Sequence, residues 1–301
     1  MKKGLFIALS LCIGASLLIF IQATDLKKAS LLISQIGYRF YLLLFITYIA
    51  YLLGTLSWQY TFGESLKKVP LNRLFLIRHV GETAAWFNPT SVIGGDALKG
   101  VLLAKYEVDK KLVVSSLLLS RMIMIISQMT LLAITVCYLL LQHPEGSMSR
   151  LSFIKLGTIS LSSIRTDASR KLKEVYSDLK IMLHTHQRLL LISFGFAILH
   201  WLVGSLEFFF ILKFLGLKIT LFQALLVDLG VIVFKAAGAF IPGQLGVEEY
   251  GNKIMLMVIG IPGAEIWVSA SILRRARQLV WAGFGILVYF IMFNKQKPIE
   301  Q

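Results

Sequence analysis

Long apolar runs separated by short polar stretches occupy most of this 301-residue chain. Six runs approach or exceed the roughly 20 residues that a helix needs to cross the hydrocarbon core of a bilayer. These runs are 4–22, 41–61, 112–141, 189–212, 220–241 and 265–293. Two shorter runs, 71–88 and 251–263, are either further crossings or halves of re-entrant hairpins. The pattern predicts an all-α fold, a polytopic membrane helix bundle of 6–8 spans with two broken or re-entrant helices.

The composition supports this class of protein, because 56% of the residues are hydrophobic and the mean hydropathy is +0.74. A soluble domain cannot bury that much apolar surface. The net charge of +15 comes from basic residues that are scattered through the connecting segments. Anionic lipid headgroups are the expected counter-charge for such residues, and no nucleic-acid partner is expected.

One small pattern occurs twice in the chain. A proline is followed by an acid and then by an arginine, and the same three positions recur 153 residues later: Pro89, Asp96 and Arg121, then Pro242, Glu249 and Arg274. Small, flexible residues follow each proline, which suits a broken membrane helix better than a straight span. Matching breaks in two halves indicate a transporter-like binding site. The predicted repeats are 36–141 and 189–293, and a chance match of loop ends is the alternative.

The remaining segments complete a single integral membrane domain. Residues 1–35 are expected to hold a first helix and a loop. Met1–Ala23 resembles a signal peptide, but its apolar stretch is longer than the ~7–15 residues of a cleavable one, so an uncleaved helix with a cytoplasmic N-terminus is expected. Residues 142–188 read as a basic amphipathic connector that either lies on the membrane or packs on the bundle. Residues 294–301 are a polar tail.

Charged residues inside apolar segments are the main candidates for a site. An arginine or aspartate at the bilayer centre costs about 2.5–3.5 kcal/mol, so such residues pair, face a cavity and serve a function. Arg121 lies well inside an apolar run, and its guanidinium matches phosphate oxygens two at a time. The predicted substrate-binding residues are Asn88, Pro89, Gly94, Gly95, Asp96, Lys99, Arg121, Pro242, Gly243, Gly246, Glu248, Glu249 and Arg274.

The acids in this set are expected either to hold the arginines when no substrate is bound or to grip a cationic headgroup. The alternative is that Asp96–Arg121 and Glu249–Arg274 are purely structural ion pairs that join helices.

Weaker candidates are Glu82, Lys235 and Arg275. Glu82 and Lys235 are 153 residues apart, at matching repeat positions, and are expected to pair across a pseudo-twofold interface. Arg275 and Arg277 stand near the start of the last span and are expected to snorkel to its interface. Glu207 and Asp228 lie within long apolar runs. They are either further cavity residues or residues close to helix ends whose predicted positions are wrong.

Metal and redox chemistry find no support in the sequence. His184 and His186 lack further ligands and read as surface histidines. Cys12 and Cys137 both fall in predicted spans and form no ligand or disulfide framework. No phosphate-loop motif appears, so neither a metal nor another cofactor is expected, and no catalytic residue is assigned.

The two motif regions resemble a known family. The stretch from Asn88 to Lys99 with Arg121, and the stretch from Ile241 to Glu249 with Arg274, are similar to the lysylphosphatidylglycerol synthase transmembrane region family, whose members are also described as flippase-like. The resemblance covers nearly the whole chain. It implies a multi-pass cell-membrane protein of a prokaryote that moves or modifies lipids. Gln244 stands where the family commonly has a second glycine, and Lys99 where arginine is frequent, which bears on headgroup preference.

Three classes of function follow from the sequence. The first is a flippase-like protein that binds and translocates an anionic phospholipid or a polyprenyl-phosphate-linked lipid. The second is a membrane-embedded lipid-modifying enzyme with Asp96 or Glu249 as the base. The third is a non-catalytic accessory subunit of lipid or envelope synthesis, with a lipid-synthesis enzyme as partner. The soluble aminoacyl-transfer domain of true lysylphosphatidylglycerol synthases has no counterpart in the sequence, so lysyl transfer is not expected.

Overall fold

The fold is α-helical throughout the residues that the computed structural model describes, which are 26–63, 65, 68–87, 92–106, 108–142, 186–238, 241 and 244–294. The α-helices are α2 (Leu26–Ile36), α3 (Arg39–Tyr60), α4 (Leu71–Phe87), α5 (Val92–Leu103), α6 (Lys110–Gln142), α9 (Gln187–Phe214), α10 (Leu221–Ala237), α11 (Val247–Val258) and α12 (Ala264–Asn294). A short 3-10 helix, Ala104–Tyr106, follows α5. The predicted all-α class is therefore confirmed for this part of the chain.

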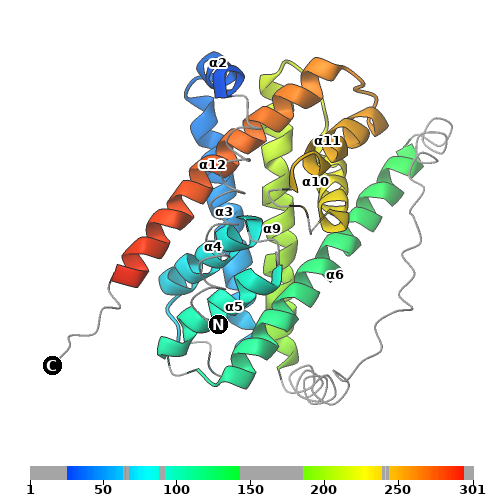
Figure 1. The fold of residues 1–301 in the computed structure, drawn as a ribbon. Coiled ribbons are helices and arrows are strands. Elements are labelled where there is room, and N and C mark those ends of the chain that lie inside the picture. The colour runs from blue at the N-terminus through cyan, green and yellow to red at the C-terminus, as the bar shows by residue number, and fades with distance from the viewer. Residues whose placement is uncertain are drawn as a thin grey trace.

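The helices follow the same order in both halves of the chain: a long helix, two short helices and a second long helix. The first set, α3 to α6, begins at residues 39, 71, 92 and 110, and the second, α9 to α12, begins at 187, 221, 247 and 264. In Figure 1, α3 runs downward and α9 upward, while α6 rises and α12 descends. The short helices α4 and α5 lie in the lower half of this view and α10 and α11 in the upper half. The two sets are thus oriented in opposite directions.

The halves interlock rather than sit side by side. The long helices α3 and α9 pack against each other along their length, α4 of the first half packs on α12 of the second, and α10 packs on α6. At this contact the buried hydroxyls of Ser57 and Ser193 lie 3.1 Å apart, and His200 Nδ1 lies 2.6 Å from the carbonyl oxygen of the small residue Ala50. The Ser193 hydroxyl donates to the Ser57 carbonyl at 2.7 Å. Small residues let helix backbones approach closely in a membrane, where the hydrophobic effect does not drive association.

Three of the described helices are long and apolar enough to cross a membrane: α3, α6 over Lys110–Leu141, and α9. Helix α10 covers the predicted run 220–241 but has only 17 residues. The runs 71–88 and 251–263 contribute to two short helices, α4 and α11. The run 4–22 lies outside the described residues, as do most of the connector and the residues of the tail after Asn294. The predicted total of 6–8 spans is therefore not confirmed.

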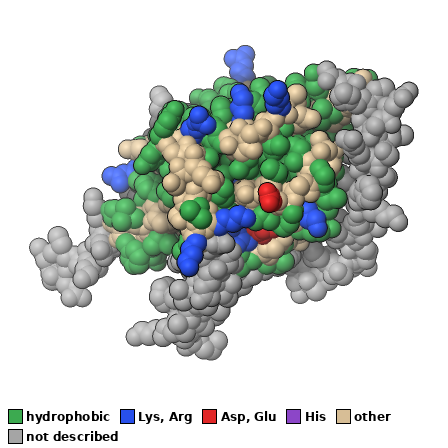
Figure 2. All heavy atoms as spheres, turned by 90° about the horizontal axis from the view of Figure 1, so that it is seen from above, with side chains coloured by type: hydrophobic (Ala, Val, Ile, Leu, Met, Phe, Trp, Pro, Cys, Tyr) green, Lys and Arg blue, Asp and Glu red, His purple; other side chains and the backbone are tan. Residues whose placement is uncertain are grey.

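Helix α2 occupies part of the region for which the sequence pattern predicts a loop. It buries Ala29, Leu32 and Ile36, three or four residues apart, and packs on α12. Figure 2 looks onto this end of the molecule and shows scattered basic side chains with few acidic ones. At the opposite end, Arg73, Lys111 and Arg188 are exposed. Both ends are therefore suited to anionic headgroups.

Helices α4 and α5 pack through backbone contact at Gly81 and Gly95. A Cβ added at Gly95 would collide with the Gly81 carbonyl oxygen and would come within 2.8 Å of the Ala85 Cβ. Gly95→Ala must therefore push the two helices apart, and we expect a loss of about 1–3 kcal/mol in the free energy of unfolding. Gly195 in α9 is the matched control, because nothing lies within 4 Å of its added Cβ. Gly195→Ala should leave stability unchanged or raise it by about 0.5–1 kcal/mol. Unfolding midpoints of the detergent-purified variants test the comparison, and equal midpoints would contradict it.

Candidate functional site

A cavity of about 480 Å³ lies between the two halves. Helices α3 to α6 of the first half and α9 and α10 of the second contribute side chains to it. Its charged lining residues are Arg78, Glu82, Asp96, Lys99, Arg121 and Lys235. Aromatic side chains, Tyr51, Trp58, Trp86 and Trp201, form much of the remaining wall. The cavity thus combines charged groups with apolar surfaces.

Asp96 lies at the centre of the first charged cluster. The Arg121 guanidinium donates to Asp96 through Nε at 2.5 Å and through Nη2 at 2.8 Å, so the contact is bidentate. Lys99, one turn after Asp96 on α5, donates to Asp96 Oδ1 at 3.2 Å and to Glu82 Oε1 at 2.6 Å. The Lys99 ammonium also lies over the Trp58 ring. Helices α4, α5 and α6 therefore meet at one chain of ion pairs.

Arg78 adds a cation to this cavity without a carboxylate of its own. Its Nη1 donates to the Tyr51 carbonyl at 3.2 Å, and none of the carboxylates in the described residues forms an ion pair with it. Its guanidinium fills the space above Gly54, where an added Cβ would overlap it. With Arg78 counted, the first cluster has three basic side chains and two acidic ones.

Arg78 is not among the predicted site residues, because it stands with Lys67, Lys68 and Arg73 in a group of basic residues that is typical of a surface. The spacing between Arg78 and Glu82 in the sequence could have identified Arg78 as a site residue. Arg78 precedes Glu82 by four residues, so the two share one face of α4, whereas Arg73 lies on a different face and is exposed.

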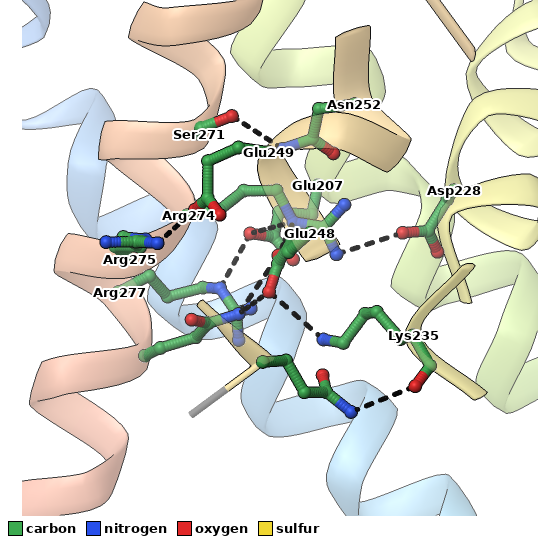
Figure 3. Close-up of polar contacts among 12 residues, drawn as sticks. Glu207, Asp228, Lys235, Glu248, Glu249, Asn252, Ser271, Arg274, Arg275 and Arg277 are labelled. Atoms are coloured by element: carbon green, nitrogen blue, oxygen red, sulfur yellow. Dashed lines mark hydrogen bonds and ion pairs between the residues drawn. The ribbon is translucent and has the colours of Figure 1, made fainter. Parts of the chain in front are cut away.

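The second charged cluster is built around Arg274, and Figure 3 shows its contacts. Arg274 Nη2 lies 3.1 Å from Asp228 Oδ1, and its Nε lies 3.2 Å from Glu248 Oε1 and 3.8 Å from Glu207 Oε1. Arg277 donates through Nε to Glu207 at 2.6 Å. Arg274, Asp228 and Glu248 are each exposed by only about 5%. Buried charges at this density are stable only when each has a partner.

Lys235 joins the second cluster to the cavity. Its ammonium lies 3.2 Å from Glu248 Oε2, and the residue also lines the cavity between the halves. Gln278 donates to both oxygens of Glu248, at 3.0 and 3.1 Å. With Lys235, the cluster has three basic side chains, Lys235, Arg274 and Arg277, against three acidic ones, Glu207, Asp228 and Glu248. It is therefore neutral, unlike the first cluster.

The structure contains the Asp96–Arg121 contact, but the expected contact between Glu249 and Arg274 is wrong. Arg274 contacts Glu248, while Glu249 pairs with Arg275 at 2.5 Å. Adjacent residues on a helix point about 100° apart, so Glu248 and Arg274 meet on one side of their helices and Glu249 and Arg275 on another. Glu249 also accepts the Gly246 backbone N–H at 2.8 Å and so caps α11.

The expected Glu82–Lys235 pair across the interface is also wrong. Both residues line the same cavity, but each takes its partner within its own half, Lys99 for Glu82 and Glu248 for Lys235. Arg275 and Arg277 are buried and paired rather than directed to a membrane interface. Glu207 and Asp228, for which two alternatives stood, lie in the buried second cluster.

Two of the predicted glycines, Gly95 and Gly246, have packing or conformational roles in the structure. Gly95 provides close contact with α4, and Gly246 adopts a φ of +80° where α11 begins. Gly94 lies on α5, two residues before Asp96. Asn88, Pro89, Pro242 and Gly243 lie outside the described residues. Substrate binding by any of these residues stays a prediction.

Metal-binding potential is absent from the described ranges, in which no group of three or more His, Cys, Asp or Glu residues is placed to hold an ion. Of the two neighbouring histidines noted in the sequence, His184 lies outside those ranges.

Apolar helices around buried charge clusters define a helical membrane protein. The family model for the lysylphosphatidylglycerol synthase TM region matches residues 7–286, and the chain belongs to that family. The family assignment made from the two motif regions is thereby confirmed, and it supports a membrane location. No curated protein and no solved structure matched the chain.

Arg274 tests how strongly the second cluster depends on pairing. Arg274→Met leaves Asp228 without its ion-pair partner and weakens the contacts of Glu248 and Glu207, so we expect a loss of about 3–5 kcal/mol in the free energy of unfolding. Arg188→Met at the exposed start of α9 is the control and should change stability by less than about 0.5 kcal/mol. Thermal unfolding of both variants in the same detergent provides the measurement. A stable Arg274→Met variant would show that the acids do not need this guanidinium.

Proposed function

We propose that this protein binds the phosphate of an anionic lipid in the cavity between its halves and carries the headgroup across the membrane. The observation that carries the proposal is the charge of the cavity: the first cluster has one more cation than acids, and no carboxylate among the described residues forms an ion pair with Arg78. A phosphodiester has one negative charge, which would balance this excess. An anionic phospholipid and a polyprenyl-phosphate-linked lipid share that phosphate chemistry.

The geometry of the cavity suits an amphiphile. Guanidinium groups bind phosphate oxygens as a planar fork, and both Arg78 and Arg121 line the cavity. Asp96 holds Arg121 through two hydrogen bonds when no anion is bound, so an incoming phosphate competes with a contact that is already oriented. The tryptophan and tyrosine rings offer an apolar surface to the glycerol and upper chain region.

The opposed halves support translocation rather than simple binding. Inverted helix repeats with broken helices are typical of alternating-access transporters. The pairs α4–α5 and α10–α11 would each form a broken or re-entrant crossing, since α5 and α11 have 12 residues and extend only about 18 Å. With the long helices, and with the apolar run 4–22 as a further crossing, these pairs would give a multi-pass protein of 6–8 spans.

The two matching arginines are unequally accessible. The Arg121 side chain is 33% exposed, whereas Arg274 is only 6% exposed. In an inverted repeat, the two halves can exchange conformations. Arg274 would then become accessible and Arg121 buried, and the cavity would open to the opposite side of the membrane. The structure is consistent with a state in which the first half is open to the cavity and the second is closed.

Arg78 provides the direct test of function. In liposomes, the wild-type protein should move labelled lipid between leaflets, and Arg78→Gln should slow this transfer about tenfold or more because a charge-assisted contact with phosphate is lost. Arg73→Gln removes the same charge from the same helix at an exposed position and should retain the wild-type rate. Parallel assays with labelled phosphatidylglycerol and with a polyprenyl phosphate distinguish the two sources of phosphate.

Two results would contradict the proposal. A wild-type protein that moves neither lipid would remove transport and favour an enzyme or an accessory subunit that acts with a lipid-synthesis enzyme. Equal slowing by Arg78→Gln and Arg73→Gln would indicate a general effect of positive charge rather than a site in the cavity.

Membrane topology offers an independent test. Lys111 at the start of α6 and Lys218 between α9 and α10 are exposed and lie at opposite ends of the bundle. With Cys12 and Cys137 replaced by serine, Lys111→Cys and Lys218→Cys should react with a membrane-impermeant thiol reagent from opposite sides of the membrane. Labelling of both from one side would show that α3, α6 and α9 do not all cross.

A further inference from the structure

A second cavity, of about 650 Å³, lies between α5 and α6 and meets the charged cavity. Asp96, Leu117 and Arg121 belong to both linings. Lys110 lies at the other end of this cavity. The wall between is formed by small or apolar residues: Ala97, Gly100, Val101, Ala104, Val108, Val113, Val114 and Leu118. We call this cavity the α5–α6 groove. One end is thus a bidentate ion pair, and the body is hydrocarbon-like.

The groove exists because α5 presents small residues to α6. Ala97, Gly100 and Ala104 are three or four residues apart and so lie on one face of the helix and its 3-10 extension. A Cβ added at Gly100 would meet only the Val113 Cγ1, at 3.9 Å, so the space opposite this glycine is unfilled. Val101 and Val114 are 63% and 49% exposed, which leaves the groove open along its side.

The length of the groove matches one leaflet of a bilayer. Lys110 and Arg121 mark its ends on α6, and eleven residues of helix extend about 16 Å. Half of the hydrocarbon core of a typical bilayer is about 15 Å thick. A single acyl chain has this length, whereas a polyprenyl chain of many isoprene units would extend well beyond it.

We infer that the α5–α6 groove holds one acyl chain of a phospholipid whose phosphate occupies the charged cavity. This inference rests on the proposed function and adds the class of lipid to it. The Asp96–Arg121 pair stands where the polar and apolar parts of such a lipid join, so the headgroup lies on one side of the pair and the chain on the other. The groove thereby favours a phospholipid over a polyprenyl phosphate.

A photoreactive phosphatidylglycerol, with a diazirine near the end of one acyl chain, tests the inference in liposomes. In the wild-type protein, mass spectrometry should locate cross-links on the residues of the α5–α6 groove. Ala104→Trp fills the groove and should lower these cross-links about tenfold, the scale set by overpacking a fitted space. Ala133→Trp is the matched control, because Ala133 is exposed on α6 and lines none of the cavities described above.

A short-chain lipid tests the headgroup site separately from the acyl-chain site in the groove. Dihexanoyl phosphatidylglycerol presents the same phosphate with chains too short to fill the groove, so its binding should be equal in wild type and Ala104→Trp and weakened in Arg78→Gln. Suppose that the short-chain lipid binds as expected, but the cross-links persist in Ala104→Trp or fall equally in Ala133→Trp. The acyl-chain site in the groove is then contradicted, while the headgroup site is retained. If the wild-type protein does not bind it, the proposed function and the groove both fail.

A second copy of the chain is the competing occupant, because small-residue faces also pack against other membrane helices. A bifunctional thiol cross-linker between Val101→Cys chains, in protein with Cys12 and Cys137 replaced by serine, tests this occupant. We expect no dimer when phosphatidylglycerol is present. Efficient dimer formation under those conditions would show that a helix covers the groove and would overturn the inference.

Discussion

Charged groups enclosed by apolar helices require partners, and this constraint shapes the centre of the protein. Without water, a carboxylate or guanidinium is stable only beside an opposite charge and with its hydrogen bonds satisfied. The second cluster balances its charge with three acids and three bases, while Nε and Nη1 of the buried Arg274 have no hydrogen-bond partner among the described residues. Helices α9, α10, α11 and α12 each contribute to it, so their positions are tied together by charge. The first cluster leaves one cation over, and this difference makes its cavity suited to an anion.

The interlocking of the two halves explains why the cavity lies where it does. Because α4 packs on α12 and α10 packs on α6, neither half can enclose its own short helices alone. The space left between the crossed pairs is lined by residues of both halves. Glycine at the α4–α5 contact brings the ion-paired side chains of these short helices together.

Hydropathy and spacing predicted the helical class and the segments that carry the site, but not the side chains that meet. The spacing of Asp96 and Arg121 led to a contact that the structure contains. The same spacing predicted Glu249 as the partner of Arg274, whereas the structure has its neighbour Glu248. A sequence repeat predicts which helices correspond, but not how each helix is rotated about its axis. Arg78 was missed because a group of basic residues is typical of a surface. Helical spacing relative to Glu82 places it inside.

Lys235 gives the cavity a thermodynamic link to the buried cluster. Its ammonium faces the space between the halves and also neutralises Glu248, which shares Arg274 with Asp228. If an anion binds in the cavity as proposed and attracts Lys235, it would weaken the contact between Lys235 and Glu248 and so change the charge balance around Arg274. Because linkage is reciprocal, a rearrangement of the second cluster that strengthened such binding would itself be favoured by the bound anion to the same extent. Under the proposed function, this one side chain would couple the occupancy of the cavity to the conformation of the second half.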